Sequence, residues 1–178
     1  MNNKSNNCIF AGKVGFFVVG IIGCINHFLY KLSGCNPIVG MVTPINESTW
    51  EHLKLLFFPY ILYTITEFFI YGRHINGFLF SRIKGLLAGL IFIPAGFYTY
   101  TAILGNNFFL ADILLFFAAV YLSFRISTVS IGRKTKTGIS RTLSALLLIA
   151  GITILFIGFT LYPPSAPLFE SSSAITFI

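Results

Sequence analysis

Charged side chains are scarce in this chain. Only 10% of its 178 residues are Asp, Glu, Lys or Arg, whereas soluble domains carry about 25%. So few charges cannot cover a water-facing surface, and 56% of the residues are hydrophobic. The composition therefore predicts an integral membrane protein. The net charge of +7 does not indicate nucleic-acid binding, because the basic residues flank apolar segments and do not gather on one soluble face.

Cysteine and the common catalytic motifs are also nearly missing. Cys8, Cys24 and Cys35 have neither a metal-binding spacing nor a convincing disulfide partner, so we expect them to be small apolar packing residues and one free thiol. The sequence contains no HExxH, nucleotide-binding GxGxxG or Walker motif. Any catalytic site would have to be assembled from side chains on separate helices.

Five apolar runs are each long enough to cross a bilayer as a helix, which takes about 20 residues. A barrel is not expected, because it would require alternating ten-residue strands. We predict an all-α integral membrane protein, a bundle of about five transmembrane helices forming one domain over residues 1–178. The spans are expected at about 14–32, 49–71, 83–104, 108–127 and 143–162, followed by an extracytoplasmic tail at 163–178.

Lys and Arg residues predict the orientation of this bundle. Ten of the twelve fall at the N-terminus, between spans two and three, or between spans four and five. Only Lys31 and Lys54 fall on the other side. Because cytoplasmic loops are enriched in basic residues, we expect the N-terminus inside and the C-terminus outside.

Two features predict how the helices pack. Gly85 and Gly89 form a GxxxG step, which lets helices approach closely, and we expect it to serve packing within the chain. Glu67, near the inner end of span two, is expected to pair with Arg73 or Lys84.

Polar residues gather toward the predicted extracytoplasmic end. His27 and Asp112 lie inside their spans, where an ionisable group is costly unless it faces the bundle interior. This distribution predicts an outward-opening polar pocket. Its candidate ligand-binding residues are Glu47, Glu51, His52, His27, Asp112, Lys54 and Trp50, and the candidate ligands of a divalent metal are His27, His52, Glu47 and Asp112.

The segment 46–54 is the most polar part of the chain. On a helix, Glu47, Glu51 and Lys54 would form one stripe, with His52 turned about 100° from Glu51. A structural alternative is a capping box in which Ser48 and Glu51 satisfy the first free amides, with Trp50 as an interface anchor. The proline-rich tail after Tyr162 is expected to fold back over the same end, bringing Glu170 near.

Asn46–Lys54 reads Asn-Glu-Ser-Thr-Trp-Glu-His-Leu-Lys, and Tyr162 is followed by two prolines. These segments resemble the signature of a family of small multi-pass bacterial membrane proteins of unknown function. The resemblance implies a bacterial cell membrane and supplies no activity. Residue by residue, it points to Asn46, Glu47, Ser48, Trp50, Glu51, His52 and Lys54.

Three functions remain open at this stage. The first is binding or transport of a small polar or cationic ligand in the outward-facing pocket, because buried ionisable residues in membrane proteins are usually functional. The second is a membrane-embedded metal-dependent hydrolase acting at the outer leaflet. The third is a structural or assembly partner without a ligand. The lipid bilayer is the expected partner in each case. Another membrane subunit is a further expected partner if the chain takes part in transport or assembly.

Overall fold

The computed structural model describes residues 3–132 and 139–171. The basic residues Arg133, Lys134 and Lys136, and the end of the expected tail, lie outside the described residues. The elements follow one another as α1 (Asn3–Leu32), α2 (Pro37–Gly40), α3 (Thr49–Ile70), the 3-10 helix η1 (Gly72–His74), α4 (Phe78–Leu104), α5 (Phe109–Gly132), α6 (Ile139–Leu161) and the 3-10 helix η2 (Pro167–Phe169).

Five helices in the described part of the chain are long and apolar enough to cross a membrane. They confirm the predicted all-helical fold and indicate a multi-pass membrane protein. The helix starts differ most from the prediction: α4 begins at Phe78, where a span from residue 83 was expected. The polar residues that interrupt the apolar run, such as Arg82 and Lys84, are good helix formers. A helix therefore continues past the end of its apolar stretch.

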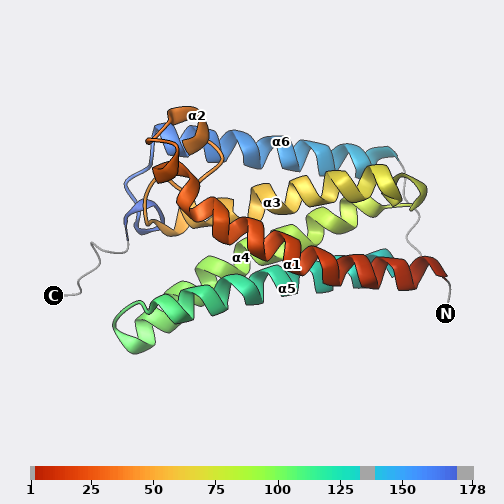
Figure 1. The fold of residues 1–178 in the computed structure, drawn as a ribbon, viewed down its shortest axis with the longest axis horizontal. Coiled ribbons are helices and arrows are strands. Elements are labelled where there is room, and N and C mark those ends of the chain that lie inside the picture. The colour runs from red at the N-terminus through yellow and green to blue at the C-terminus, as the bar shows by residue number, and fades with distance from the viewer. Residues whose placement is uncertain (1–2, 133–138, 172–178) are drawn as a thin grey trace.

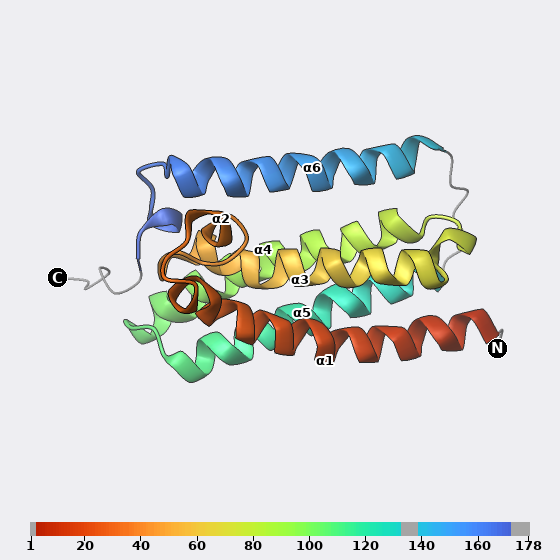
Figure 2. The same ribbon diagram turned by 45° about the horizontal axis from the view of Figure 1, so that its top comes forward.

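The five long helices lie side by side with their axes roughly aligned (Figure 1). In Figure 2, α6 lies along one side of the bundle, α1 and α5 lie on the other, and α3 and α4 pass between them. The connections collect at two ends. We call the end with residues 33–48, 105–108 and 162–171 the pocket end. The opposite end, with residues 71–77 and the start of α1, is called the basic end.

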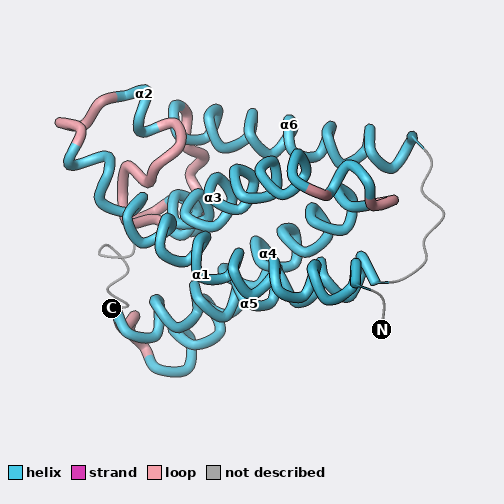
Figure 3. Tube along the Cα trace, turned by 45° about the vertical axis from the view of Figure 1, so that its right-hand side comes forward, coloured by secondary structure: helices cyan, strands magenta, loops and turns pink. Residues whose placement is uncertain are grey.

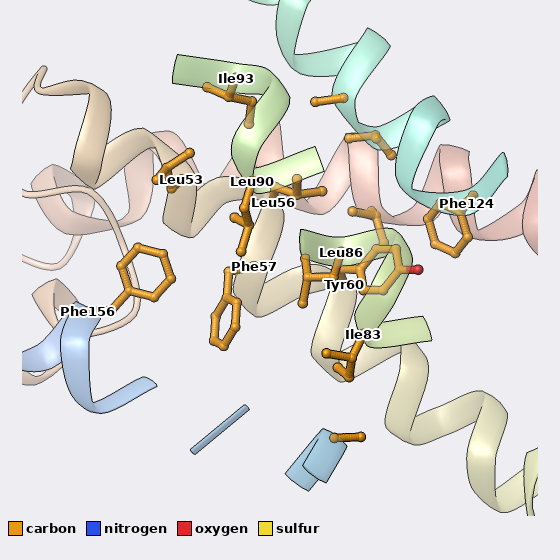
Figure 4. Close-up of a cluster of buried hydrophobic side chains, with 14 residues drawn as sticks. Leu53, Leu56, Phe57, Tyr60, Ile83, Leu86, Leu90, Ile93, Phe124 and Phe156 are labelled. Carbon is orange, nitrogen blue, oxygen red and sulfur yellow. The ribbon is translucent and has the colours of Figure 1, made fainter. Parts of the chain in front are cut away.

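The core lies along α3, where α4 and α5 meet it. Figure 4 shows Leu56, Phe57 and Tyr60 of α3 facing Leu86 and Leu90 of α4, with Phe124 of α5 beside them. The Tyr60 and Phe124 rings lie 4.7 Å apart. Lipid tails are as apolar as these side chains, so close van der Waals packing holds the helices together.

Glycine allows α4 and α5 to approach closely. A Cβ atom added at Gly85 would lie 2.2 Å from the Ser123 carbonyl oxygen, and one at Gly89 would lie 2.1 Å from Ser123 Oγ. The predicted GxxxG step therefore packs within the chain, as expected.

A buried ion pair holds the basic end together. Arg82 Nη2 lies 2.5 Å from Glu67 Oε1, and Arg82 Nη1 donates to Ser127 Oγ at 2.6 Å. The prediction that Glu67 pairs with Arg73 or Lys84 is therefore wrong. Because α4 begins earlier than expected, Arg82 lies within the helix and is fully buried, whereas Arg73 is exposed in η1.

The pocket end is built from loops that fold over the helices (Figure 3). The Asn26 side-chain amide donates to Val42 O at 3.1 Å, which holds the loop against α1. The segment after α6 folds back, as expected: Phe169 stacks on Trp50 at 5.1 Å, and an antiparallel bridge pairs Ser171 with Ser48. Glu170 is exposed on this segment.

Candidate functional site

A pocket of about 540 Å³ lies near the pocket end, between α1, α3, α4 and α5. Its walls combine four of the predicted site residues with a larger number of apolar ones. The predicted residues are His27, Glu47, His52 and Asp112. The structure thus brings together side chains from α1, the loop before α3, α3 itself and α5.

The start of α3 positions Glu47 and His52. Ser48 is the N-cap, and its Oγ accepts a hydrogen bond from the Glu51 amide at 3.3 Å. The Asn46 side chain accepts from the Ser48 amide at 2.9 Å. Glu47 therefore lies before the helix begins, and the predicted stripe of Glu47, Glu51 and Lys54 does not form.

His52 is fixed by a backbone contact on one side of its ring. Its Nδ1 lies 2.8 Å from the Ser48 carbonyl oxygen. Because a carbonyl can only accept a hydrogen bond, Nδ1 must carry the hydrogen. In the neutral ring Nε2 then carries only a lone pair, so it can accept a hydrogen bond but cannot donate one. That nitrogen lies 3.4 Å from Glu47 Oε2. A neutral His52 would therefore oppose two acceptors, so this contact requires either a protonated His52 that donates from Nε2 to Glu47, or a cation between the two atoms.

The carboxyl of Glu47 responds to this contact. Its pKa is lowered from the ordinary value, chiefly by the hydrogen bond from His52 and against the opposing effect of burial. Glu47 is therefore ionised at neutral pH and supplies a negative charge at the mouth of the pocket.

His27 completes a close group of metal-ligand atoms. One such atom from each of His27, Glu47 and His52 lies within 4.8 Å of the other two. The His27 and His52 ring centroids are 5.2 Å apart. His27 Nδ1 is buried and has no hydrogen-bond partner among the described residues, and His27 lines the pocket.

Asp112 lines the same pocket but lies outside this close group. The Tyr100 hydroxyl donates a hydrogen bond to Asp112 Oδ1, which fixes the carboxyl on the wall formed by α4 and α5. Asp112 is also close enough to His52 to interact with it electrostatically.

Glu51 and Lys54 lie away from the pocket, in a buried ion pair of 2.7 Å. Lys54 Nζ also donates to Gly40 O at 2.9 Å and to Thr43 O at 3.3 Å. Glu51 Oε2 accepts from the Ile45 amide at 3.0 Å. This pair therefore binds the loop that leads to Glu47. Ser48 caps α3 as predicted, but the Glu51 carboxylate binds Lys54 and this loop, and not the free amide that the predicted capping box assigned to it.

Trp50 faces α6 and the returning tail instead of the pocket. Its ring lies 4.9 Å from Phe156 and 5.3 Å from Phe159. Trp50 thus joins α3 to α6, which is a packing contact.

Sequence reasoning did not identify the pocket's remaining walls. Cys24 and Asn107 line it, as do apolar residues of α4 and α5 such as Ile93 and Phe116. Asn107 could have been found as a polar residue in the short turn before Asp112. The apolar lining carries no sequence signal, because it reads like any other part of a membrane span.

Comparison with known proteins identifies a family. Residues 2–177 match a family of unknown function (DUF6512), and the chain belongs to that family. Neither the curated proteins nor the solved structures contain a significant match.

Proposed function

We propose that this membrane protein binds a divalent transition-metal ion, with zinc as the best fit, in a pocket that faces the extracytoplasmic side. The observation that carries the proposal is the contact between His52 Nε2 and Glu47 Oε2 at 3.4 Å. Two ligand atoms that each lie about 2.1 Å from a tetrahedral zinc ion are about 3.4 Å apart. The pair therefore has the spacing of two ligands of one ion.

The surroundings of His52 support the same reading. Metal-binding histidines usually donate their second ring nitrogen to a backbone carbonyl or carboxylate, which fixes the ring and its tautomer. His52 Nδ1 has such a contact with Ser48 O. A cation beside Nε2 would also relieve the opposition of two acceptors.

His27 would supply the third ligand. Its ligand atom is within 4.8 Å of the other two, so its ring would move inward by roughly 1–1.5 Å to reach a tetrahedral spacing. Two imidazoles and one carboxylate are a set that zinc uses in catalytic sites, where a fourth position stays open. The donor set is less suited to Mg²⁺ or Ca²⁺, which prefer oxygen ligands.

The orientation rests on the distribution of basic residues. Arg73, Arg82 and Arg125 are among those toward the basic end, and cytoplasmic loops are the ones enriched in Lys and Arg. The pocket end would then face outward, with Glu47 in reach of extracytoplasmic cations.

The packing of the bundle favours binding of the ion over its transport, if this chain acts alone. Packed side chains of the core cluster, including Leu56, Tyr60 and Phe124, fill the bundle between the pocket and the basic end. Transport would therefore need a second membrane subunit or a large rearrangement.

A metal-dependent hydrolase is the second candidate, and Asp112 favours it. This carboxyl lines the pocket without belonging to the three-ligand group, as a general base would. Asp112 would accept a proton from a water whose oxygen adds to an ester carbonyl, and a cation held by His27, Glu47 and His52 would supply Lewis-acid polarisation at that carbonyl. The ester's C–O bond breaks, and the departing alkoxide takes the proton back from Asp112.

Elemental analysis of the purified protein tests the proposal. After dialysis against zinc and then against metal-free buffer, we expect about one zinc per chain, and a large loss of zinc in His52→Ala and in Glu47→Gln. His74→Ala is the matched control, because His74 is exposed at the basic end. Wild-type protein without zinc, or equal zinc in His52→Ala and His74→Ala, would refute the cation site.

A further inference from the structure

The pocket is larger than a cation requires. A divalent ion with about six waters takes on the order of 200 Å³, at roughly 30 Å³ per water. The pocket measures about 540 Å³, so more than half of it remains for another molecule.

Most of that remaining wall is apolar. The residues concerned come from α3, α4 and α5, and include Leu55, Ile93, Phe97, Ile113, Leu115 and Phe116. An apolar pocket with a few convergent polar groups is typical of a site for an organic ligand.

The apolar wall also reaches deep along the helices. Ile93 lies 11 residues before Leu104, the last residue of α4, which is about 16 Å at 1.5 Å per residue. The hydrocarbon core of a bilayer is about 30 Å thick. The pocket thus extends from the polar group near the helix ends to about the middle of the bundle.

We propose that this apolar chamber holds the hydrocarbon chain of a single-chain amphipathic lipid, whose oxyanion head coordinates the cation at His27, Glu47 and His52. The position of the head rests on the proposed cation site, whereas the place of the chain rests on the chamber alone. Three protein ligands leave a coordination position open for the head. The chain would lie against Ile113 and Phe116, at the depth where lipid chains lie in the surrounding bilayer.

The test uses two zinc-binding probes that share one head. Radiolabelled dodecanoyl hydroxamate carries a hydrocarbon chain, and acetohydroxamate does not. Binding to zinc-loaded protein in lipid nanodiscs is measured after subtraction of the signal from empty nanodiscs. We expect dodecanoyl hydroxamate to bind at least tenfold more tightly. Equal affinities for the two probes would overturn the proposal.

A matched pair of variants locates the chain. Ile113→Trp fills the chamber, whereas Leu114→Trp makes the same addition at the next residue, which is exposed and does not line the pocket. We expect Ile113→Trp to weaken dodecanoyl hydroxamate at least tenfold, with zinc content and acetohydroxamate binding unchanged. Equal effects of the two tryptophans would contradict the chamber.

A metal-free arm separates this inference from the cation site. Radiolabelled dodecanoate is bound to the metal-free protein and to the same two variants. The chamber predicts that dodecanoate binds more weakly to Ile113→Trp than to Leu114→Trp. This difference does not depend on whether the wild-type protein binds zinc in the elemental analysis. Loss of zinc binding with this difference preserved would refute the cation site alone. Zinc binding without the difference would refute the chamber alone.

Discussion

Replacing Lys54 with methionine removes one charge from a buried pair while keeping most of the side-chain volume. The Lys54 side chain is fully buried and that of Glu51 is 3% exposed. After the change, Glu51 keeps the Ile45 amide at 3.0 Å and the Thr160 hydroxyl at 2.8 Å, but it has lost its counter-charge. Breaking a buried pair from one side costs about 3–5 kcal/mol, and we expect Lys54→Met to lower the free energy of unfolding by that amount.

The double variant Glu51→Gln/Lys54→Met leaves no uncompensated charge and should recover at least half of the loss. Lys13→Met is the control, since Lys13 is exposed on α1 and surface changes usually stay within about 0.5 kcal/mol. Unfolding by sodium dodecyl sulfate can be followed by the fluorescence of Trp50, the one tryptophan in the chain. Trp50 lies beside this pair on α3.

The same variant also tests how the loop positions Glu47. Lys54 holds Gly40 and Thr43 through their carbonyl oxygens, so its loss should weaken zinc binding although Lys54 does not line the pocket. The double variant should restore zinc affinity only in part, because Gly40 and Thr43 stay released. A cost below about 1 kcal/mol, or a double variant no more stable than Lys54→Met, would refute the reasoning.

Three further predictions follow from the packing, the ionisable groups and the charge distribution. Gly85→Ala should destabilise the protein by about 1–3 kcal/mol through overpacking against Ser123. Gly151→Ala is the control, because no atom lies within 4 Å of the added Cβ, and it should be neutral or stabilising by up to about 1 kcal/mol. Similar Tm shifts in the two variants would contradict this. Zinc affinity measured by calorimetry should fall as the pH drops from 8 to 5, because protons compete with the metal for the neutral imidazoles of His27 and His52. Glu47 should not contribute there, because its lowered pKa keeps it ionised until the pH falls below the usual carboxyl range; constant affinity from pH 8 to 5 would exclude histidine ligands. A reporter fused after Ile178 should be active only in its extracytoplasmic form, and cytoplasmic activity would reverse the orientation.

The sequence predicted the helical fold because each span is a continuous apolar run, and hydrocarbon leaves the backbone no alternative to a helix. It predicted the helix starts less well. Arg82 fell just outside the expected span 83–104 because it ends the apolar run, but α4 begins at Phe78 and continues through it. Its burial against Glu67 depends on the placement of α3 and α4, which no local pattern encodes.

The candidate site was predictable in the same partial way. His27, Glu47, His52 and Asp112 could be grouped from sequence, because few other charges exist at that depth to pair with them. Glu51 was grouped with Glu47 on the assumption that one helix carries both. The helix begins at Thr49, so Glu47 lies in the loop before it and does not share a helical face with Glu51. The Glu51 carboxylate instead binds Lys54 and the Ile45 amide.

The most direct test of the proposed cation site is X-ray absorption at the zinc edge on the zinc-loaded protein. The proposed site predicts a first shell of nitrogen and oxygen at about 2.0–2.1 Å, with outer-shell scattering from two imidazoles that decreases in His52→Ala and in His27→Ala but not in His74→Ala. A sulfur shell at about 2.3 Å, which would indicate Cys24 on the pocket wall, or a spectrum unchanged in both histidine variants, would contradict it.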